Sequence, residues 1–110
     1  MIVNHPISIE ITLGAGVSVL YTNTLRVAVS INSITFNNPS AYDIELTVNR
    51  AVPSGSVVAY SFTLSAGDVV KDNNLYVLRF GDSISVNIST GGTNCLLYGR
   101  PLEGVTSATS

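Results

Sequence analysis

Apolar and polar residues alternate along most of the chain, which is the pattern of β-strands with one buried face. The segments 7–13 and 42–48 are the most regular, with an apolar residue at every second position. Shorter alternating runs lie at residues 17–22, 25–31, 58–64 and 84–88. Glycine, proline and asparagine separate these runs, and no segment has the 3.6-residue period of an amphipathic helix. The pattern predicts an all-β chain.

Two segments depart from simple alternation. The apolar phase shifts at Asn32 and Ser33, which predicts a bulge or bend that keeps both halves of one strand facing the core. The segment LYVLRF, residues 75–80, is apolar on both faces, as in a central strand or a strand covered by a partner. Leu75, Tyr76 and Leu78 are therefore candidate interface residues.

The number and spacing of the runs predict one domain over residues 1–110. We expect a single β-sandwich of about seven to eight antiparallel strands, of the immunoglobulin-like or the jelly-roll type. The N-terminal segment 1–6 and the C-terminal segment 104–110 lie outside the alternating runs and are candidate contacts with a partner.

Composition changes this picture by making the surface unusually uncharged. Charged residues are 11% of the chain, against roughly 25% in typical domains. Ser, Thr and Asn together contribute 34 residues, so the polar surface is mostly neutral and suits assembly, including a homo-oligomer. The net charge of −2 and the scattered Lys and Arg argue against nucleic acid. No signal sequence or membrane-spanning apolar run is present, which predicts synthesis in a cytoplasm.

Catalytic groups are scarce. The chain has one histidine, His5, and one cysteine, Cys95, far apart in the sequence. Hydrolytic or nucleophilic catalysis needs a base held beside a nucleophile, and no such pair stands out. We therefore expect no enzymatic activity and no cofactor. Cys95 lies in an apolar strand-like segment and is interpreted as a small core residue.

Asp68 and Asp72 are weak candidates for a calcium site, because they gather carboxylate oxygens in one polar segment with Asn73 and Asn74. The spacing matches no EF-hand loop, and the same residues are typical of a tight turn. A turn is the favoured interpretation, and no metal is expected.

Two further positions are predicted to be structural turns. Asn38 and Pro39 lie in an NNPS turn that ends a strand, since proline lacks a ladder donor. At Gly81 and Asp82, glycine permits a positive φ and the aspartate side chain can accept backbone N–H groups. Phe80, just before this corner, is expected to anchor it in the core.

The stretches NNPSAYDIELTV, PSGSVVAYSFTLSAGD and NNLYVLRFGDSISVNIST resemble small β-sandwich structural proteins of tailed bacteriophages, over about residues 34–105. The matching residues are Asn38, Pro39, Ser40, Gly67, Asp68, Gly81, Asp82, Ser83 and Ile84. The resemblance implies a non-enzymatic virion protein made in the bacterial cytoplasm. Its implied partners are the major capsid protein or other virion proteins, and decoration proteins of this kind are often trimers.

Three functions follow as hypotheses. The first is a capsid decoration or cement protein that stabilises a phage shell. The second is an adaptor in the neck, tail or fibre base of the virion. The third is a module that binds a glycan or protein on a host surface.

Overall fold

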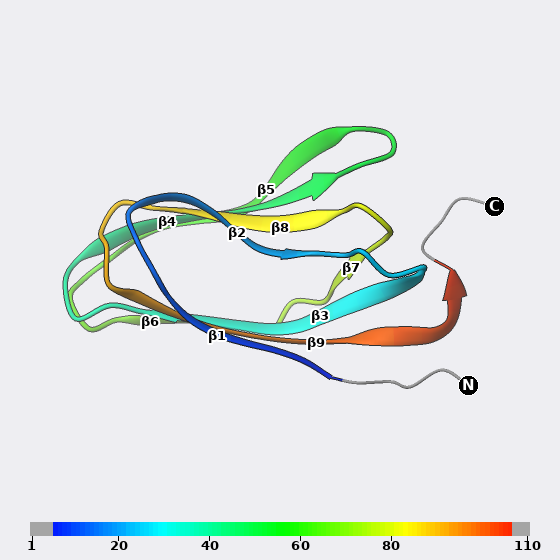
Figure 1. The fold of residues 1–110 in the computed structure, drawn as a ribbon. Helices are drawn as coiled ribbons and strands as arrows, with labels where there is room; N and C mark the ends of the chain where they lie inside the picture. Colours follow the sequence, from blue (N-terminus) through cyan, green and yellow to red (C-terminus); the bar gives the residue numbers. More distant parts are fainter. Residues whose placement is uncertain (1–5, 107–110) are drawn as a thin grey trace.

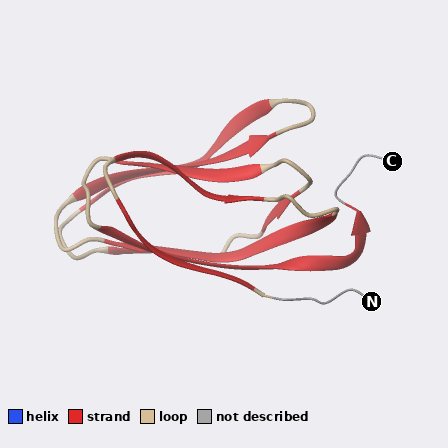
Figure 2. Cartoon of the chain, viewed as in Figure 1, coloured by secondary structure: helices blue, strands red, loops and turns tan. Residues whose placement is uncertain are grey.

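The computed structural model describes residues 6–106, and this part of the chain is all β, as predicted (Figures 1 and 2). Its nine strands are β1 (Ile7–Leu13), β2 (Gly16–Thr22), β3 (Val27–Asn37), β4 (Tyr42–Arg50), β5 (Gly55–Leu64), β6 (Val69–Asp72), β7 (Tyr76–Leu78), β8 (Ser83–Ile88) and β9 (Thr93–Thr106). No helix in the described range is long and apolar enough to cross a membrane.

The strands form two antiparallel sheets that face each other (Figure 1). One sheet has the order β1-β9-β3-β6, with the short β7 also paired to β3, and the other has the order β2-β8-β4-β5. The chain passes from one sheet to the other at every connection except β4–β5 and β6–β7, which is the jelly-roll arrangement. The predicted single β-sandwich is confirmed, and jelly-roll rather than immunoglobulin-like is its topology.

The core lies between the two sheets and consists of the inward side chains of the alternating runs. Among its fully buried members are Ile31, Ile34, Phe36, Ile44, Leu46, Leu78, Ile84 and Leu97. The register between β3 and β9 shifts between Ile31 and Ser33, where the phase change predicted a bulge. The irregularity lets one long strand supply both Ile31 and Ile34 to the same core.

The structure of segment 75–80 differs from three expectations. It is not a central strand, because β7 has three residues and pairs with β3 alone. Leu78 is fully buried and Leu75 is 62% exposed, so Leu78 is a core residue and not an interface residue. Phe80 is 54% exposed and does not anchor the following corner in the core.

The predictions for His5 and for the two terminal segments fall wholly or partly outside the described residues, whereas Cys95 lies within them. His5 and most of segment 1–6 lie outside the described residues, as do residues 107–110 of the C-terminal segment. Cys95 is 2% exposed, and burial raises the pKa of its thiol to about 12. At neutral pH this thiol is therefore protonated and shielded from solvent.

Gly99 occupies a crowded position in β9, between Ile7 of β1 and Ile31 of β3. A Cβ there would stand 2.5 Å from the Ser30 carbonyl oxygen. We expect Gly99→Ala to lower the free energy of unfolding by about 2 kcal/mol, because the central strands must separate to admit the methyl group. Urea denaturation measures the loss. Gly14→Ala is the control, since nothing lies within 4 Å of the added carbon; equal effects of the two variants would refute the steric argument.

Candidate functional site

The two edge strands of the four-stranded sheet are β2 and β5. Their sequences, GVSVLYT and GSVVAYSFTL, contain no charged residue and no proline. An edge strand presents unpaired backbone N–H and C=O groups, and proteins usually protect such edges with charged side chains, proline or a covering loop. Charge and proline are missing from both of these edges.

The five-stranded sheet has charged edges instead. Its edge strand β1 carries Glu10, and β6 at the opposite edge carries Lys71 and Asp72. Glu10 and Lys71 are exposed, whereas Asp72 is buried. In the five-stranded sheet, only the short β7, which has three residues and pairs with β3 alone, is an edge strand without a charged residue. The two long unprotected edges therefore belong to the four-stranded sheet.

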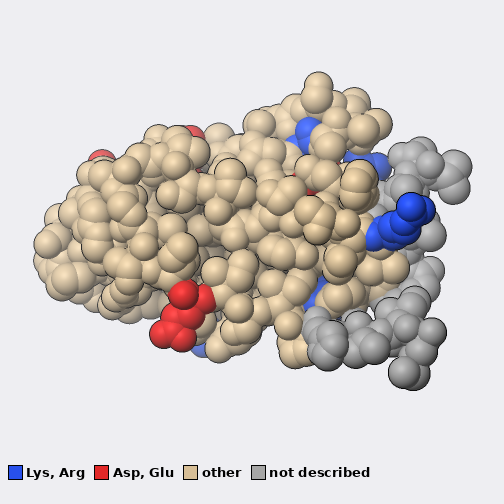
Figure 3. All heavy atoms as spheres, in the orientation of Figure 1, with Lys and Arg blue, Asp and Glu red and all other residues tan. Residues whose placement is uncertain are grey.

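Apolar side chains on the outer face of the four-stranded sheet are confined to the same two edges. On β2, Val17 is 72% and Val19 61% exposed, and on β5, Val58 is 51% exposed. Between them, β8 and β4 present Ser83, Ser85, Asn87, Asp43, Glu45, Thr47 and Asn49 to this face. Figure 3, which views the two sheets from the side, shows that this flank of the molecule is also largely uncharged. The outer surface is thus polar in its middle and apolar at each rim.

The inner face of β5 is also incompletely covered. Val57 and Phe62 pair with the core residues Val48 and Ile44, yet they are 66% and 48% exposed. Phe62 stacks on Tyr60 with ring centroids 5.2 Å apart. The hairpin of β4 and β5 extends away from the opposite sheet (Figure 1), which explains why these side chains reach solvent. β5 therefore exposes apolar groups on both of its faces.

A cavity of about 450 Å³ lies beside β5 and includes one predicted interface residue, Tyr76. The Tyr76 hydroxyl donates a hydrogen bond to the Asp72 carboxylate at 2.7 Å. Burial, with this hydrogen bond to the carboxylate, raises the pKa of Tyr76 to about 12. The cavity is lined by Val48, Arg50, Val57, Val58, Ala59, Asn74 and Tyr76. Of the three predicted interface residues, Leu75 and Tyr76 reach the surface.

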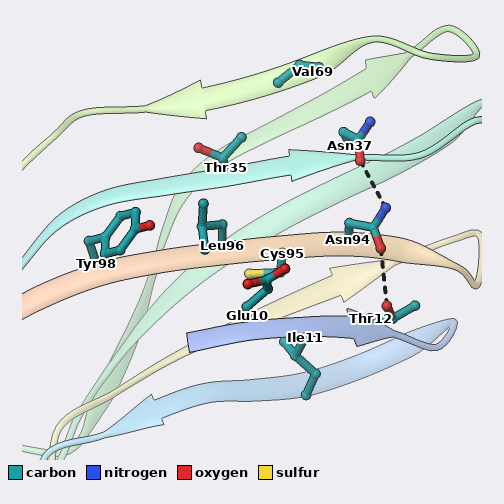
Figure 4. A pocket seen from close by; sticks show the side chains of 10 residues that line it. All are labelled: Glu10, Ile11, Thr12, Thr35, Asn37, Val69, Asn94, Cys95, Leu96 and Tyr98. Atoms are coloured by element: carbon teal, nitrogen blue, oxygen red, sulfur yellow. Dashed lines mark hydrogen bonds between the residues drawn. The ribbon is translucent and has the colours of Figure 1, made fainter. Parts of the chain in front are cut away.

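A second hollow, of about 610 Å³, lies on the outer face of the five-stranded sheet (Figure 4). A polar ladder crosses it, in which Thr12 donates to Asn94 and Asn94 donates to Asn37, each at 3.1 Å. Tyr98, 45% exposed, stands apart from the ladder (Figure 4). Because these ladder side chains bond to one another, they brace three strands rather than present a set of free groups to a ligand.

The calcium candidates are occupied by hydrogen bonds within the chain. Asp68 accepts the Ser65 N–H at 3.1 Å, and its backbone carbonyl accepts the Tyr42 hydroxyl at 2.8 Å. Asp72 accepts the Asn74 N–H and the Tyr76 hydroxyl. In the described residues, no three His, Cys, Asp or Glu side chains gather to hold a metal ion. The carboxylates of Asp68 and Asp72 therefore stabilise the turns in which they lie, as the favoured interpretation predicted.

The Gly81-Asp82 corner connects three parts of the chain. Gly81 has a φ of +85°, and the Asp82 side chain is 1% exposed. Its carboxylate accepts the N–H groups of Ala51 and Arg79 at 2.9 Å and the Arg50 guanidinium at 2.8 Å. Burial alone would raise the pKa of Asp82, but these hydrogen bonds and the Arg50 charge outweigh it and lower the pKa below 3.8.

Asn38, like Asp82, is a buried polar residue that joins separate turns of the chain, and it is 1% exposed. Its amide donates to the Thr93 hydroxyl at 2.8 Å and to the Gly91 carbonyl at 3.2 Å, and its side-chain oxygen accepts the Ser40 N–H. The neighbouring Pro39 is exposed. Asn38 thus ties the turn after β3 to the turn before β9.

The comparisons with known proteins concern the fold. No protein-family model matches the chain, and no curated protein matches it. Among solved structures, the fold is similar to that of a Bacillus endospore appendage, from a family of disulfide-linked pili. The match covers 92% of this chain and 88% of the other, with 12% sequence identity and a TM-score of 0.50.

This finding corrects the expected function. The similar structure belongs to a pilus and not to a phage capsid, neck or tail, so the prediction of a virion protein with capsid partners is wrong. A pilus also gives no support to the alternative of a host-surface binding module. The sequence motifs that suggested a phage protein lie at turns of the jelly roll, where Asn38 and Asp82 hold the fold together.

Proposed function

We propose that this chain is a non-enzymatic structural subunit that associates with further copies of itself. The observation that carries the proposal is the unprotected pair of edges on the four-stranded sheet, where β2 and β5 expose valines and carry no charge. Such edges bind other strands through backbone hydrogen bonds. The low overall charge reduces repulsion between copies. The similar fold of a pilus subunit agrees with the proposal.

Association of this kind would be non-covalent. The sequence contains a single cysteine, Cys95, and it is buried in the core. A disulfide needs two accessible sulfur atoms with Cβ atoms about 4 Å apart, and a buried thiol in one copy does not meet its counterpart in another. Backbone pairing and apolar contact at the sheet edges therefore have to supply the binding energy.

The proposal is tested by placing a charge on the edge strand. We expect Val58→Lys to weaken self-association by roughly tenfold, because pairing of β5 would bring the ammonium group into an apolar contact. Sedimentation velocity over a concentration series measures the assembled fraction. Asn87→Lys is the matched control, since it adds the same charge to the same face on the central strand β8. The proposal fails if the unsubstituted chain is monomeric throughout, or if both variants assemble as it does.

A further inference from the structure

The two flanks of the sandwich are matched to each other in strand direction. In the four-stranded sheet every neighbouring pair is antiparallel, so β2 at one edge runs opposite to β5 at the other. In the row β1-β9-β3-β6 of the second sheet every neighbouring pair is also antiparallel, so β1 runs opposite to β6. A second copy placed beside the first in the same orientation would therefore continue the antiparallel alternation in both sheets.

The edges that would meet lie on the correct sides. A two-residue loop joins β1 to β2, so these strands form one flank of the sandwich. A four-residue loop joins β5 to β6, which places those strands together on the opposite flank. One flank thus presents β1 and β2, and the other presents β5 and β6, as the arrangement in Figure 1 also shows.

The exposed charges on the edge strands are complementary across these flanks. Glu10 is paired with Leu96, Leu96 with Thr35, and Thr35 with Lys71. The four residues form one row across the sheet, with a carboxylate at one end and an ammonium at the other. When copies are placed side by side, the Lys71 end of one row approaches the Glu10 end of the next. Like charges at these two positions would have repelled the same arrangement.

Resting on the proposed function, we infer that copies associate side by side in one orientation, with β5 of one copy paired antiparallel to β2 of the next. Lys71 of the first copy then faces Glu10 of the second, and Val58 approaches Val17 or Val19 on the outer face. Because the contact joins two different edges, each copy keeps one free edge of each kind. Such a head-to-tail contact grows into an open polymer unless the copies close into a ring.

Charge reversal tests the complementary rows. We expect Glu10→Lys and Lys71→Glu each to weaken association by roughly fivefold, since a pair of opposite charges becomes a pair of like charges. Mixing the two variants should restore assembly, because copies that alternate between the variants bring an ammonium group against a carboxylate at every contact. The double variant should also assemble. The two single variants and the double variant should fold as the unsubstituted chain does, since positions 10 and 71 are exposed. Asp43→Lys on the central strand β4 is the matched control.

Cross-linking tests the strand pairing itself. Copies bearing Val17→Cys and copies bearing Val58→Cys are mixed and treated with a short bismaleimide, and the native Cys95 stays silent because it is buried. We expect cross-links between the two variants. Links only between Val58→Cys copies would show a two-fold pairing of β5 with β5 and overturn the inference.

The outcomes separate the two proposals. If the unsubstituted chain forms no assemblies at any concentration, the proposed function fails and this inference fails with it. If the chain assembles but the charge reversals have no effect, or the mixed variants do not recover, copies associate through another contact and only this inference is overturned.

Discussion

Leu78→Asp is expected to leave the chain unfolded. Leu78 is fully buried, and its β7 strand is paired to Val29 in the centre of the core. A carboxylate at this site finds no solvent, so it must be buried unpaired or protonated, and the leucine packing is lost as well. The combined cost, at least about 4 kcal/mol, approaches the whole stability of a domain at the low end of the usual range of roughly 5–15 kcal/mol, where a chain of this size is expected to lie. Circular dichroism and urea denaturation would show the loss.

Leu75→Asp is the matched control, three residues earlier in the same apolar segment. Leu75 is 62% exposed, so the carboxylate stays hydrated and the folded state should keep its stability to within about 0.5 kcal/mol. Leu78→Ala adds a milder measurement, with an expected loss of about 3 kcal/mol from the cavity it creates. A cooperative urea transition of Leu78→Asp at the midpoint of the unsubstituted chain would contradict the assigned core.

The contrast between Leu75 and Leu78 shows where sequence reasoning ends. Alternation predicts strands because one face of each strand must be buried, and this was sufficient for the all-β sandwich and for the irregularity at Asn32 and Ser33. Alternation does not say which strands are neighbours. The segment 75–80 was apolar on both faces, and only its pairing with β3 alone shows that it is a short edge segment with one buried leucine.

The candidate site was missed for the same reason. The absence of charge in residues 16–22 and 55–64 is visible in the sequence, but it gains meaning only when both segments prove to be edges of one sheet. Likewise, Glu10 and Lys71 are far apart along the chain, and three pairings of long sequence separation place them in one row. Those pairings depend on the whole core and not on any local pattern.

Asp82→Ala is expected to lower the free energy of unfolding by about 3 kcal/mol. The buried carboxylate accepts the Ala51 and Arg79 N–H groups, and its removal leaves these donors without their acceptor. The half-exposed Arg50 can turn to water, which limits its share of the loss. Urea denaturation measures the effect, with Asp43→Ala on the exposed face of β4 as the control. Equal stability of the two variants would mean that the corner contributes little.

Lowering the pH should remove, in the unsubstituted chain, part of the free energy of unfolding that the Asp82→Ala substitution removes. The folded-state pKa of Asp82 is below 3.8, so the unfolded chain binds this proton more readily than the folded one. The contribution of the carboxylate is therefore complete above pH 3.8 and disappears as the pH falls through the lower, folded-state pKa. Stability measured from pH 7 downward should fall less steeply in Asp82→Ala than in the unsubstituted chain, because the variant has already lost this group. Parallel pH profiles for the two proteins would show that other carboxylates control the response to acid.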